Sequence, residues 1–125
     1  MLLDTCALLW LAEGGGKLRR SALRQMQNSP QLGVSSISGF EIALKMANGK
    51  LRLPAPVAIW FDTVVESHGL TLMAPDLAVC LKAGQLPAIH LDPFDRLIIA
   101  TAMVHDFPIV TTDERFAAYG VETIS

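Results

Sequence analysis

The chain has 125 residues, of which 51% are hydrophobic, and its formal net charge is −2 at pH 7. This length suits one ordinary core, so we expect residues 1–125 to form a single domain. The apolar stretches are far shorter than the about 20 residues of a membrane-spanning helix, and no basic leader precedes the first of them, so a soluble cytoplasmic protein is expected. The acidic balance is atypical of a nucleic-acid-binding domain.

Short apolar segments alternate with longer segments of helical character along the chain. Because strands alternate with helices, the pattern predicts an α/β fold with a mostly parallel sheet that is covered by helices on both faces. The expected strands are 1–3, 32–35, 70–73, 108–111 and 121–124. The expected helices are 5–12, 18–28, 38–48, 56–68, 76–84, 94–106 and 114–119. The glycine triplet 14–16 is expected to separate the first two helices.

The cysteines and histidines are given structural interpretations. Cys6 and Cys80 lack the CxxC spacing and the clustered histidines of zinc sites, so both are expected to pack as small hydrophobic side chains. His90 lies in a loop that can come near the acidic residues, but a lone histidine in a loop is more often a surface residue than a ligand, so a surface position is expected. His68 and His105 lie at the ends of helices, where an imidazole interacts favourably with the helix dipole. No catalytic role is assigned to any of the three histidines.

Several acidic residues stand at expected helix starts, where a carboxylate has a purely structural explanation. Asp4 and Asp113 directly follow strands and precede helices, as N-cap residues do. Glu41 follows Ser38 by three residues, which is the spacing of a capping box. Taken one at a time, these acids predict helix caps.

The segment HLDPFDRLIIATA, residues 90–102, contains two more acids immediately before an apolar run. Asp92 is followed by proline, as an N-cap with proline at the first helical position would be. Asp95 then falls at the third helical position, where the helix dipole favours a carboxylate. Asp92 is therefore predicted to start the helix, and Asp95 is free to serve another purpose.

Taken together, four of these carboxylates indicate a metal site. In an open parallel sheet with right-handed crossovers, the carboxyl ends of all strands lie along one edge, and ligands bind there. Asp4 and Asp113 follow strands at that edge, and Glu41 and Asp95 occupy the first turns of helices that begin there. Carboxylates that meet repel one another unless a cation lies among them, and a hard divalent ion, Mg²⁺ or Mn²⁺, is the natural occupant.

A divalent ion held by carboxylates favours hydrolysis of a phosphodiester. The ion lowers the pKa of a bound water and neutralises the charge that develops on the phosphoryl group. Bound cations also make an acidic pocket attractive to an anion, which answers the objection from net charge. Basic residues nearby are weaker candidates for guiding a nucleic-acid backbone, because such residues are more often simply solvated. They are Lys17, Arg19, Arg20, Arg24, Lys45, Lys50 and Arg52, of which Lys45 also suits an i, i+4 pair with Glu41.

Four segments in order resemble the motifs of PIN-domain ribonucleases, and within them the toxins of VapBC-type toxin-antitoxin systems. The segments are LLDTCALLWLA, VSSISGFEIALKMANGKLRLP, DPFDRLIIATA and IVTTDERF, and together they run from Met1 to the final strand. The resemblance implies a PIN-like three-layer α/β/α domain with a mostly parallel five-stranded sheet. It also implies an Mg²⁺- or Mn²⁺-dependent endoribonuclease that blocks translation. Members of this family are typically homodimers that a cognate antitoxin inhibits, often by placing a basic side chain near the acids.

The resemblance assigns roles to the four acids. Asp4, Glu41 and Asp95 match the core metal-binding residues, and Asp113 matches a fourth one that the family uses more variably. Cys6 departs from the pattern, because close relatives commonly carry histidine there. No role of that histidine can therefore be transferred to this chain.

Four further residues match supporting positions of the family. Thr5 and Thr111 match hydroxyls that position water or carboxylates. Asp92 matches a recurrent residue that we interpret as a helix start, and Arg96 matches a residue whose role is either structural or phosphate-facing.

Two other functions are compatible with the sequence, and a third is disfavoured. The chain would also suit a PIN nuclease that processes RNA without being a toxin, or an interaction module whose acids only cap helices. A phosphatase with Asp4 as nucleophile is disfavoured, because it would need a second acid at the position of Cys6. Saturable binding of a divalent metal would distinguish a nuclease from a module with capping acids alone.

Overall fold

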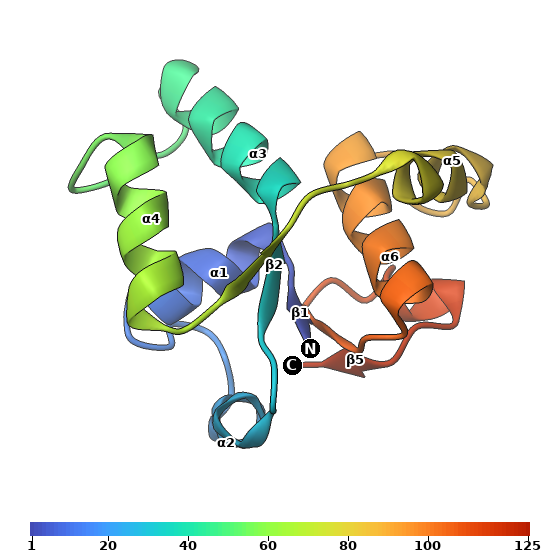
Figure 1. The fold of residues 1–125 in the computed structure, drawn as a ribbon, viewed down its shortest axis with the longest axis horizontal. Helices are drawn as coiled ribbons and strands as arrows, with labels where there is room; N and C mark the ends of the chain where they lie inside the picture. The colour runs from blue at the N-terminus through green and yellow to red at the C-terminus, as the bar shows by residue number, and fades with distance from the viewer.

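The computed structural model describes residues 1–125, the whole chain, as a parallel sheet between helices (Figure 1). Strands β1 to β5 are Leu2–Leu3, Gly33–Ser35, Thr71–Met73, Ile109–Val110 and Thr123–Ile124. Helices α1 to α6 are Thr5–Ala12, Arg20–Asn28, Ser36–Ala47, Val57–Ser67, Leu77–Gln85 and Pro93–His105. All predicted strands and the first six predicted helices are present, whereas the seventh forms only a 3₁₀ turn, Ala117–Tyr119. None of the helices has the length and apolar character that a membrane crossing requires.

All five strands are parallel, in the order β3-β2-β1-β4-β5. The chain builds outward from β1 to β2 and β3, and then returns to the other side of β1 for β4 and β5. The winding therefore reverses between β1 and β4, and ligands bind to such sheets outside the carboxyl ends of the strands at this switch point. Asp4 directly follows β1 and Thr111 directly follows β4, so the first and fourth acidic motifs begin at neighbouring strand ends.

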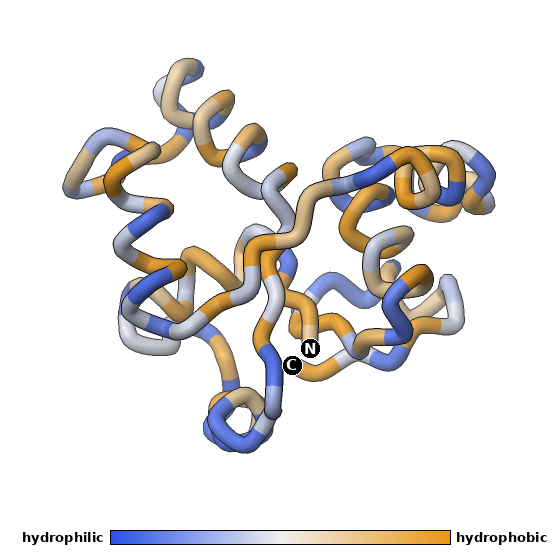
Figure 2. Tube along the Cα trace, viewed as in Figure 1, coloured by the Kyte–Doolittle hydropathy of each residue, from blue (hydrophilic) through white to orange (hydrophobic).

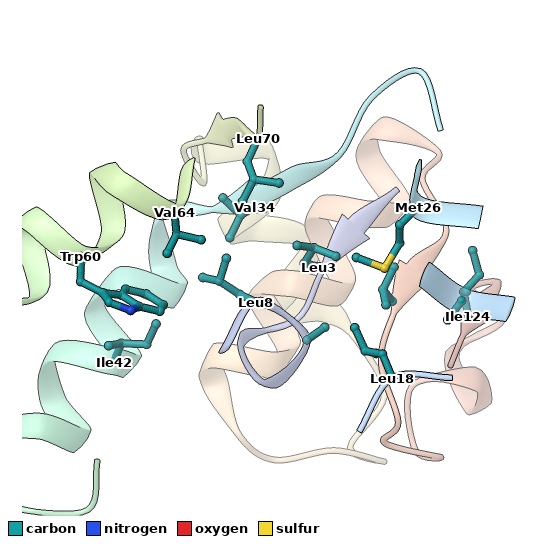
Figure 3. Packing of buried hydrophobic residues seen from close by; sticks show 13 residues of the cluster. Leu3, Leu8, Leu18, Met26, Val34, Ile42, Trp60, Val64, Leu70 and Ile124 are labelled. Atoms are coloured by element: carbon teal, nitrogen blue, oxygen red, sulfur yellow. The ribbon is translucent and has the colours of Figure 1, made fainter. Parts of the chain in front are cut away.

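The two faces of the sheet bury two separate cores, because successive side chains of a strand point to opposite faces. Leu3 and Val110 pack with residues of α1, α2, α3 and α4 (Figure 3). Leu2 and Ile109, their neighbours in the strands, pack instead with residues of α5 and α6. Figure 2 shows the strands as a hydrophobic centre and α2 as a mostly hydrophilic outer helix. The arrangement is the predicted three-layer α/β/α fold.

The glycine triplet ends α1 as predicted. Gly14, Gly15 and Gly16 all have positive φ angles, of 92°, 118° and 48°, which glycine adopts readily. At Gly16 space is also limiting, because an added Cβ would lie 2.8 Å from the side chain of Trp10. The chain can turn from α1 toward α2 here because both the backbone angles and the close approach suit glycine.

Two local predictions are wrong. Cys6 and Cys80 are exposed instead of packed in the core. The capping box at Ser38 does not form, because α3 begins directly after β2 and Ser35 caps it. Ser38 consequently lies inside the helix, where its hydroxyl is buried and is 2.9 Å from the Thr5 hydroxyl of α1. This pair of hydroxyls ties α1 to α3 at the carboxyl edge of the sheet.

The assigned core makes a direct prediction about stability. Ile98 is fully buried in α6, so Ile98→Ala should lower the free energy of unfolding by about 2 to 5 kcal/mol in a urea titration. Ile59 is 60% exposed in α4, so the chemically identical change Ile59→Ala should stay within about 0.5 kcal/mol of the wild type. Equal losses in the two variants would contradict the assigned core.

Candidate active site

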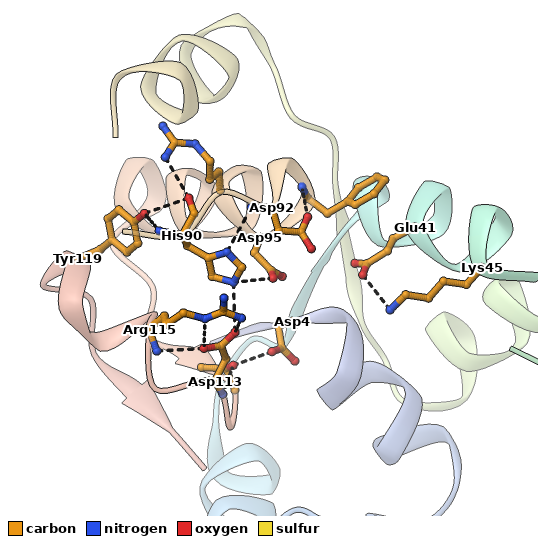
Figure 4. Close-up of polar contacts among 12 residues, drawn as sticks. Asp4, Glu41, Lys45, His90, Asp92, Asp95, Asp113, Arg115 and Tyr119 are labelled. Atoms are coloured by element: carbon orange, nitrogen blue, oxygen red, sulfur yellow. Dashed lines mark hydrogen bonds and ion pairs between the residues drawn. The ribbon is translucent and has the colours of Figure 1, made fainter. Parts of the chain in front are cut away.

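The acids of all four motifs gather at the carboxyl edge of the sheet (Figure 4). Asp4 follows β1, Glu41 lies in α3, Asp95 lies in the first turn of α6 and Asp113 follows β4. Their charges interact. Burial is the largest cause of the raised pKa of Asp4, and the carboxylates of Glu41 and Asp113 raise this pKa further. The structure therefore brings together the four acids that sequence reasoning singled out.

Asp4 has both of its carboxylate oxygens engaged. Oδ1 accepts a hydrogen bond from the backbone N–H of Ala7 at 2.7 Å, which makes Asp4 the N-cap of α1. Oδ2 accepts a hydrogen bond from the hydroxyl of Thr111 at 2.6 Å. The same hydroxyl accepts a bond from the backbone N–H of Asp113 at 3.0 Å, so Thr111 links the ends of β1 and β4. Burial raises the pKa of Asp4, and its two hydrogen bonds only partly oppose this.

Glu41 does not cap a helix, and only one of its two carboxylate oxygens has a polar partner. Its Oε2 is 3.0 Å from Nζ of Lys45, in the i, i+4 pair that the sequence predicted. Its other oxygen, Oε1, is buried and has no hydrogen-bond donor. A buried acceptor without a donor costs about 1 to 3 kcal/mol, and more when it is charged. A cation among the acids would satisfy this oxygen, so the donor set fits a divalent metal ion.

The two acids of the third motif have separate roles. Asp92 is the N-cap of α6 and accepts from the backbone N–H of Phe94 at 2.9 Å, as predicted. Asp95 lies in the first turn and accepts no capping bond. Burial, followed by the carboxylates of Asp92, Glu41 and Asp4, raises the pKa of Asp95 to about 7. A cation bound among the acids would favour the ionised form of Asp95.

Asp113 is held differently from the other three acids. Arg115 donates to it through Nε, at 3.1 Å from Oδ1, and through Nη2, at 2.9 Å from Oδ2. The pKa of Asp113 is lowered to about 2, and the hydrogen bonds from the Arg115 side chain are the largest cause. Asp113 is not the N-cap of the last helix, because the 3₁₀ turn begins only at Ala117. Asp113 is therefore ionised and already paired, in contrast to Asp95.

His90 is a residue of the site to which the sequence assigned no role, although it placed this histidine near the acids. The prediction that it lies on the surface is wrong, because it is buried with 2% exposure. Its Nε2 is 2.9 Å from Oδ2 of Asp95 and 3.1 Å from Oδ2 of Asp113. The only signal in the sequence is its position five residues before Asp95, and a single histidine in a loop shows no periodicity that would reveal its burial.

Arg96 makes the contacts of a structural residue. Its guanidinium donates to four backbone carbonyls and to no carboxylate. Nη2 donates to Ala83 O and Leu86 O at 2.8 and 2.7 Å, and Nη1 donates to Pro87 O and His90 O at 3.0 and 3.1 Å. Arg96 thus joins the first turn of α6 to the end of α5 and to the loop that carries His90. This geometry favours the structural role among the two that the sequence left open.

Comparisons with known proteins agree with this geometry. The sequence profile of the PIN domain matches residues 1–122. The chain belongs to the PIN-domain family. It is 31% identical to Ribonuclease VapC22 of Mycobacterium tuberculosis (strain ATCC 25618 / H37Rv) over 120 residues, which are 95% of this PIN domain and 91% of that protein.

Solved structures share the fold of this PIN domain. A toxin-antitoxin complex from Klebsiella pneumoniae matches with a TM-score of 0.67 at 20% identity, over 99% of this chain and 95% of the other. VapBC2 from Rickettsia felis, solved with a DNA fragment from its promoter, matches with a TM-score of 0.71 at 14% identity, over 99% and 96%. The likeness confirms the predicted three-layer fold.

The raised pKa of Asp95 predicts how the metal-free protein responds to pH. Between about pH 4 and pH 7 the folded protein keeps a proton on Asp95 that the unfolded chain releases, so this residue lowers stability as the pH rises. Asp95→Asn removes that dependence. In EDTA, the melting temperature of the variant relative to the wild type should rise from pH 4 to pH 7 and then level off. A difference that does not change with pH would contradict the assigned environment of Asp95.

Proposed function

We propose that this PIN domain is a divalent-metal-dependent endoribonuclease and acts as the toxin of a toxin-antitoxin pair that blocks translation. The observation that carries the proposal is the cluster of four carboxylates at the switch point of the sheet, with an unpaired buried oxygen on Glu41. The similarity to Ribonuclease VapC22 supports the activity, and the likeness to toxin-antitoxin complexes supports the biological role.

Asp4, Glu41 and Asp95 would hold the ion, and Asp113 would complete the acidic cluster. All four offer oxygen ligands, which suits Mg²⁺ or Mn²⁺. When bound, such an ion supplies an activated water and neutralises charge on the phosphoryl group. Thr111 keeps Asp4 oriented through its 2.6 Å hydrogen bond. Thr5 has an indirect role, because the hydrogen bond between its hydroxyl and that of Ser38 joins α1 to α3.

No side chain at the site is a good nucleophile. Cys6 is the nearest candidate, but partial desolvation of its thiol, although the residue is exposed, and the carboxylate of Asp4 raise the pKa of this thiol and keep it protonated. The carboxylates are needed for the metal. By its membership of the PIN family, the protein should use water and not the 2′-hydroxyl of the RNA as the attacking group, so the products should carry 5′-phosphate and 3′-hydroxyl ends.

A polar hollow beside Asp113 provides a path for the RNA backbone. It has a volume of about 330 Å³ and contains no hydrophobic side chain. Lys17 and Arg19 line it, so two cations stand close to the acids where phosphates must pass. Lys45 is less available, because its ammonium is already paired with Glu41. The path to the metal site thus begins at the loop between α1 and α2.

The proposal includes two protein partners, in the cytoplasm where the substrate RNA lies. A cognate antitoxin would inhibit the enzyme by placing a basic side chain among the acids, whose charges favour a cation. A second copy of the chain would cover the apolar side chains of α3 and α5. Phe40 and Leu44 lie one turn apart on α3, and Leu77 and Leu81 lie one turn apart on α5, with exposed fractions from 42% to 73%.

Substitution of the acids tests the catalytic proposal. Asp95→Asn and Glu41→Gln should each lower the rate of RNA cleavage more than about 100-fold, because loss of an outer partner of a metal ligand alone costs about 10- to 100-fold. Expression of either variant should no longer arrest growth. Asp76 caps α5 by accepting from Val79 N at 3.0 Å, away from the acidic cluster, so Asp76→Asn is a matched control that should keep full activity.

The products and the metal requirement provide the decisive measurements. Sequencing of cleaved ends in total RNA should show 5′-phosphate and 3′-hydroxyl termini, and EDTA should abolish cleavage. Ends with 2′,3′-cyclic phosphate, or full activity in EDTA, would refute the proposed mechanism. Saturable Mn²⁺ binding without any cleavage would instead favour an interaction module.

The proposed dimer predicts an effect of charge on the apolar helices. The wild type should be dimeric by light scattering at micromolar concentration, and Leu44→Glu or Leu81→Glu should give a monomer, because a buried unpaired carboxylate is costly. Val104 on α6 is 44% exposed, nearly the same as Leu44 at 42%, so Val104→Glu should leave the dimer intact. A strictly monomeric wild type would rule out the dimer.

A further inference from the structure

The imidazole of His90 joins the two sides of the acidic cluster. Its Nε2 lies within hydrogen-bond distance of Asp95 Oδ2, from α6, and of Asp113 Oδ2, from the segment after β4 (Figure 4). One ligand atom from each of the three residues lies within 4.8 Å of the others. This spacing admits two arrangements. Either all three residues coordinate one metal ion, or the histidine donates a hydrogen bond to Asp113 and lies in close ion-pair distance of Asp95.

The other nitrogen of the ring distinguishes the two arrangements. The backbone N–H of Asp92 donates to His90 Nδ1 at 3.3 Å, so Nδ1 accepts and carries no proton. The proton of the neutral imidazole is then on Nε2. A protonated Nε2 has no lone pair for a metal ion, but it can donate to the carboxylate of Asp113 and place its N–H beside the carboxylate of Asp95. The hydrogen-bond pattern therefore assigns His90 as a donor and not as a ligand.

The surroundings hold this ring in place. The backbone N–H of His90 donates to the Tyr119 hydroxyl at 2.6 Å, and that hydroxyl donates to Pro87 O at 2.8 Å. Arg96 binds His90 O at 3.1 Å, and the imidazole packs edge to face on Phe116 with ring centroids 5.8 Å apart. The backbone and the ring of His90 are thus restrained from several sides. A donor that is fixed in this way can orient flexible side chains.

We propose that His90 is a positioning residue for the metal centre. Its Nε2–H donates a hydrogen bond to Oδ2 of Asp113 at 3.1 Å, and Nε2 lies 2.9 Å from Oδ2 of Asp95, so it reduces the repulsion between the two carboxylates. Asp95 keeps one orientation before an ion arrives, and its Oδ1 stays available to the ion. Partners of this kind typically change metal affinity about 10- to 100-fold. The inference rests on the proposed metal-dependent function.

The amide side chains of glutamine and asparagine allow a matched test. In His90→Gln an amide nitrogen can occupy the position of Nε2, whereas the shorter side chain of His90→Asn does not reach the carboxylates. In a calorimetric titration with Mn²⁺, Asn should raise the Kd about 10- to 100-fold and Gln should keep it within about threefold of the wild type. In EDTA the two variants should melt at similar temperatures. His68→Asn, at the end of α4, is the control that should change neither quantity.

Tyr119→Phe provides a second variant should His90→Asn fail to fold. It removes the hydroxyl that accepts the His90 N–H and touches no carboxylate, so it should weaken Mn²⁺ binding while His90→Gln does not. Unchanged Mn²⁺ affinity in His90→Asn, or equal losses in the Asn and Gln variants, would overturn the positioning role alone. No saturable Mn²⁺ binding by the wild type would refute the metal centre itself and, with it, the role of His90.

Discussion

Electrostatic repulsion among four carboxylates at one edge of the sheet is the constraint on which the rest of this site depends. Asp4 and Asp95 are both buried enough that their pKa values are raised, and Glu41 leaves a buried oxygen without a donor. A fold that only needed helix caps would not accept this cost, because serine, threonine and asparagine cap equally well. The cost is understandable where a divalent ion is bound, since functional sites commonly carry such local conflicts.

Capping and metal binding are not competing explanations for these acids. Asp4 caps α1 through Oδ1 and still contributes a carboxylate to the cluster, whereas Asp92 caps α6 and leaves Asp95 uncommitted. Glu41 and Asp113 cap no helix, so an explanation based on caps alone fails for them. Asp4 sits at the carboxyl end of β1, where the sheet must also bind its ligand. The same position therefore suits both roles.

The two walls of the site are built in different ways. On one side, the strand ends themselves place Asp4 and Thr111, because β1 and β4 are hydrogen-bonded neighbours. On the other side, hydrogen bonds hold the loop that carries His90 in place. Arg96 binds the carbonyls at the end of α5, and Tyr119 binds the backbone of His90, so that the histidine meets Asp95 and Asp113. An irregular loop thus obtains the rigidity that the sheet provides on the opposite side.

The sequence by itself determined the α/β order, the five parallel strands and the four acids, because these depend on local periodicity and on topological rules that hold for any open parallel sheet. It did not reveal the burial of His90, the exposure of Cys6 or the true cap of α3. The burial of a single side chain depends on which distant segments pack over it, here Tyr119 and Phe116. Only the tertiary structure decided that Asp95 is half-buried among like charges while Asp113 is paired with Arg115, because a pKa depends on neighbours in space and not in sequence.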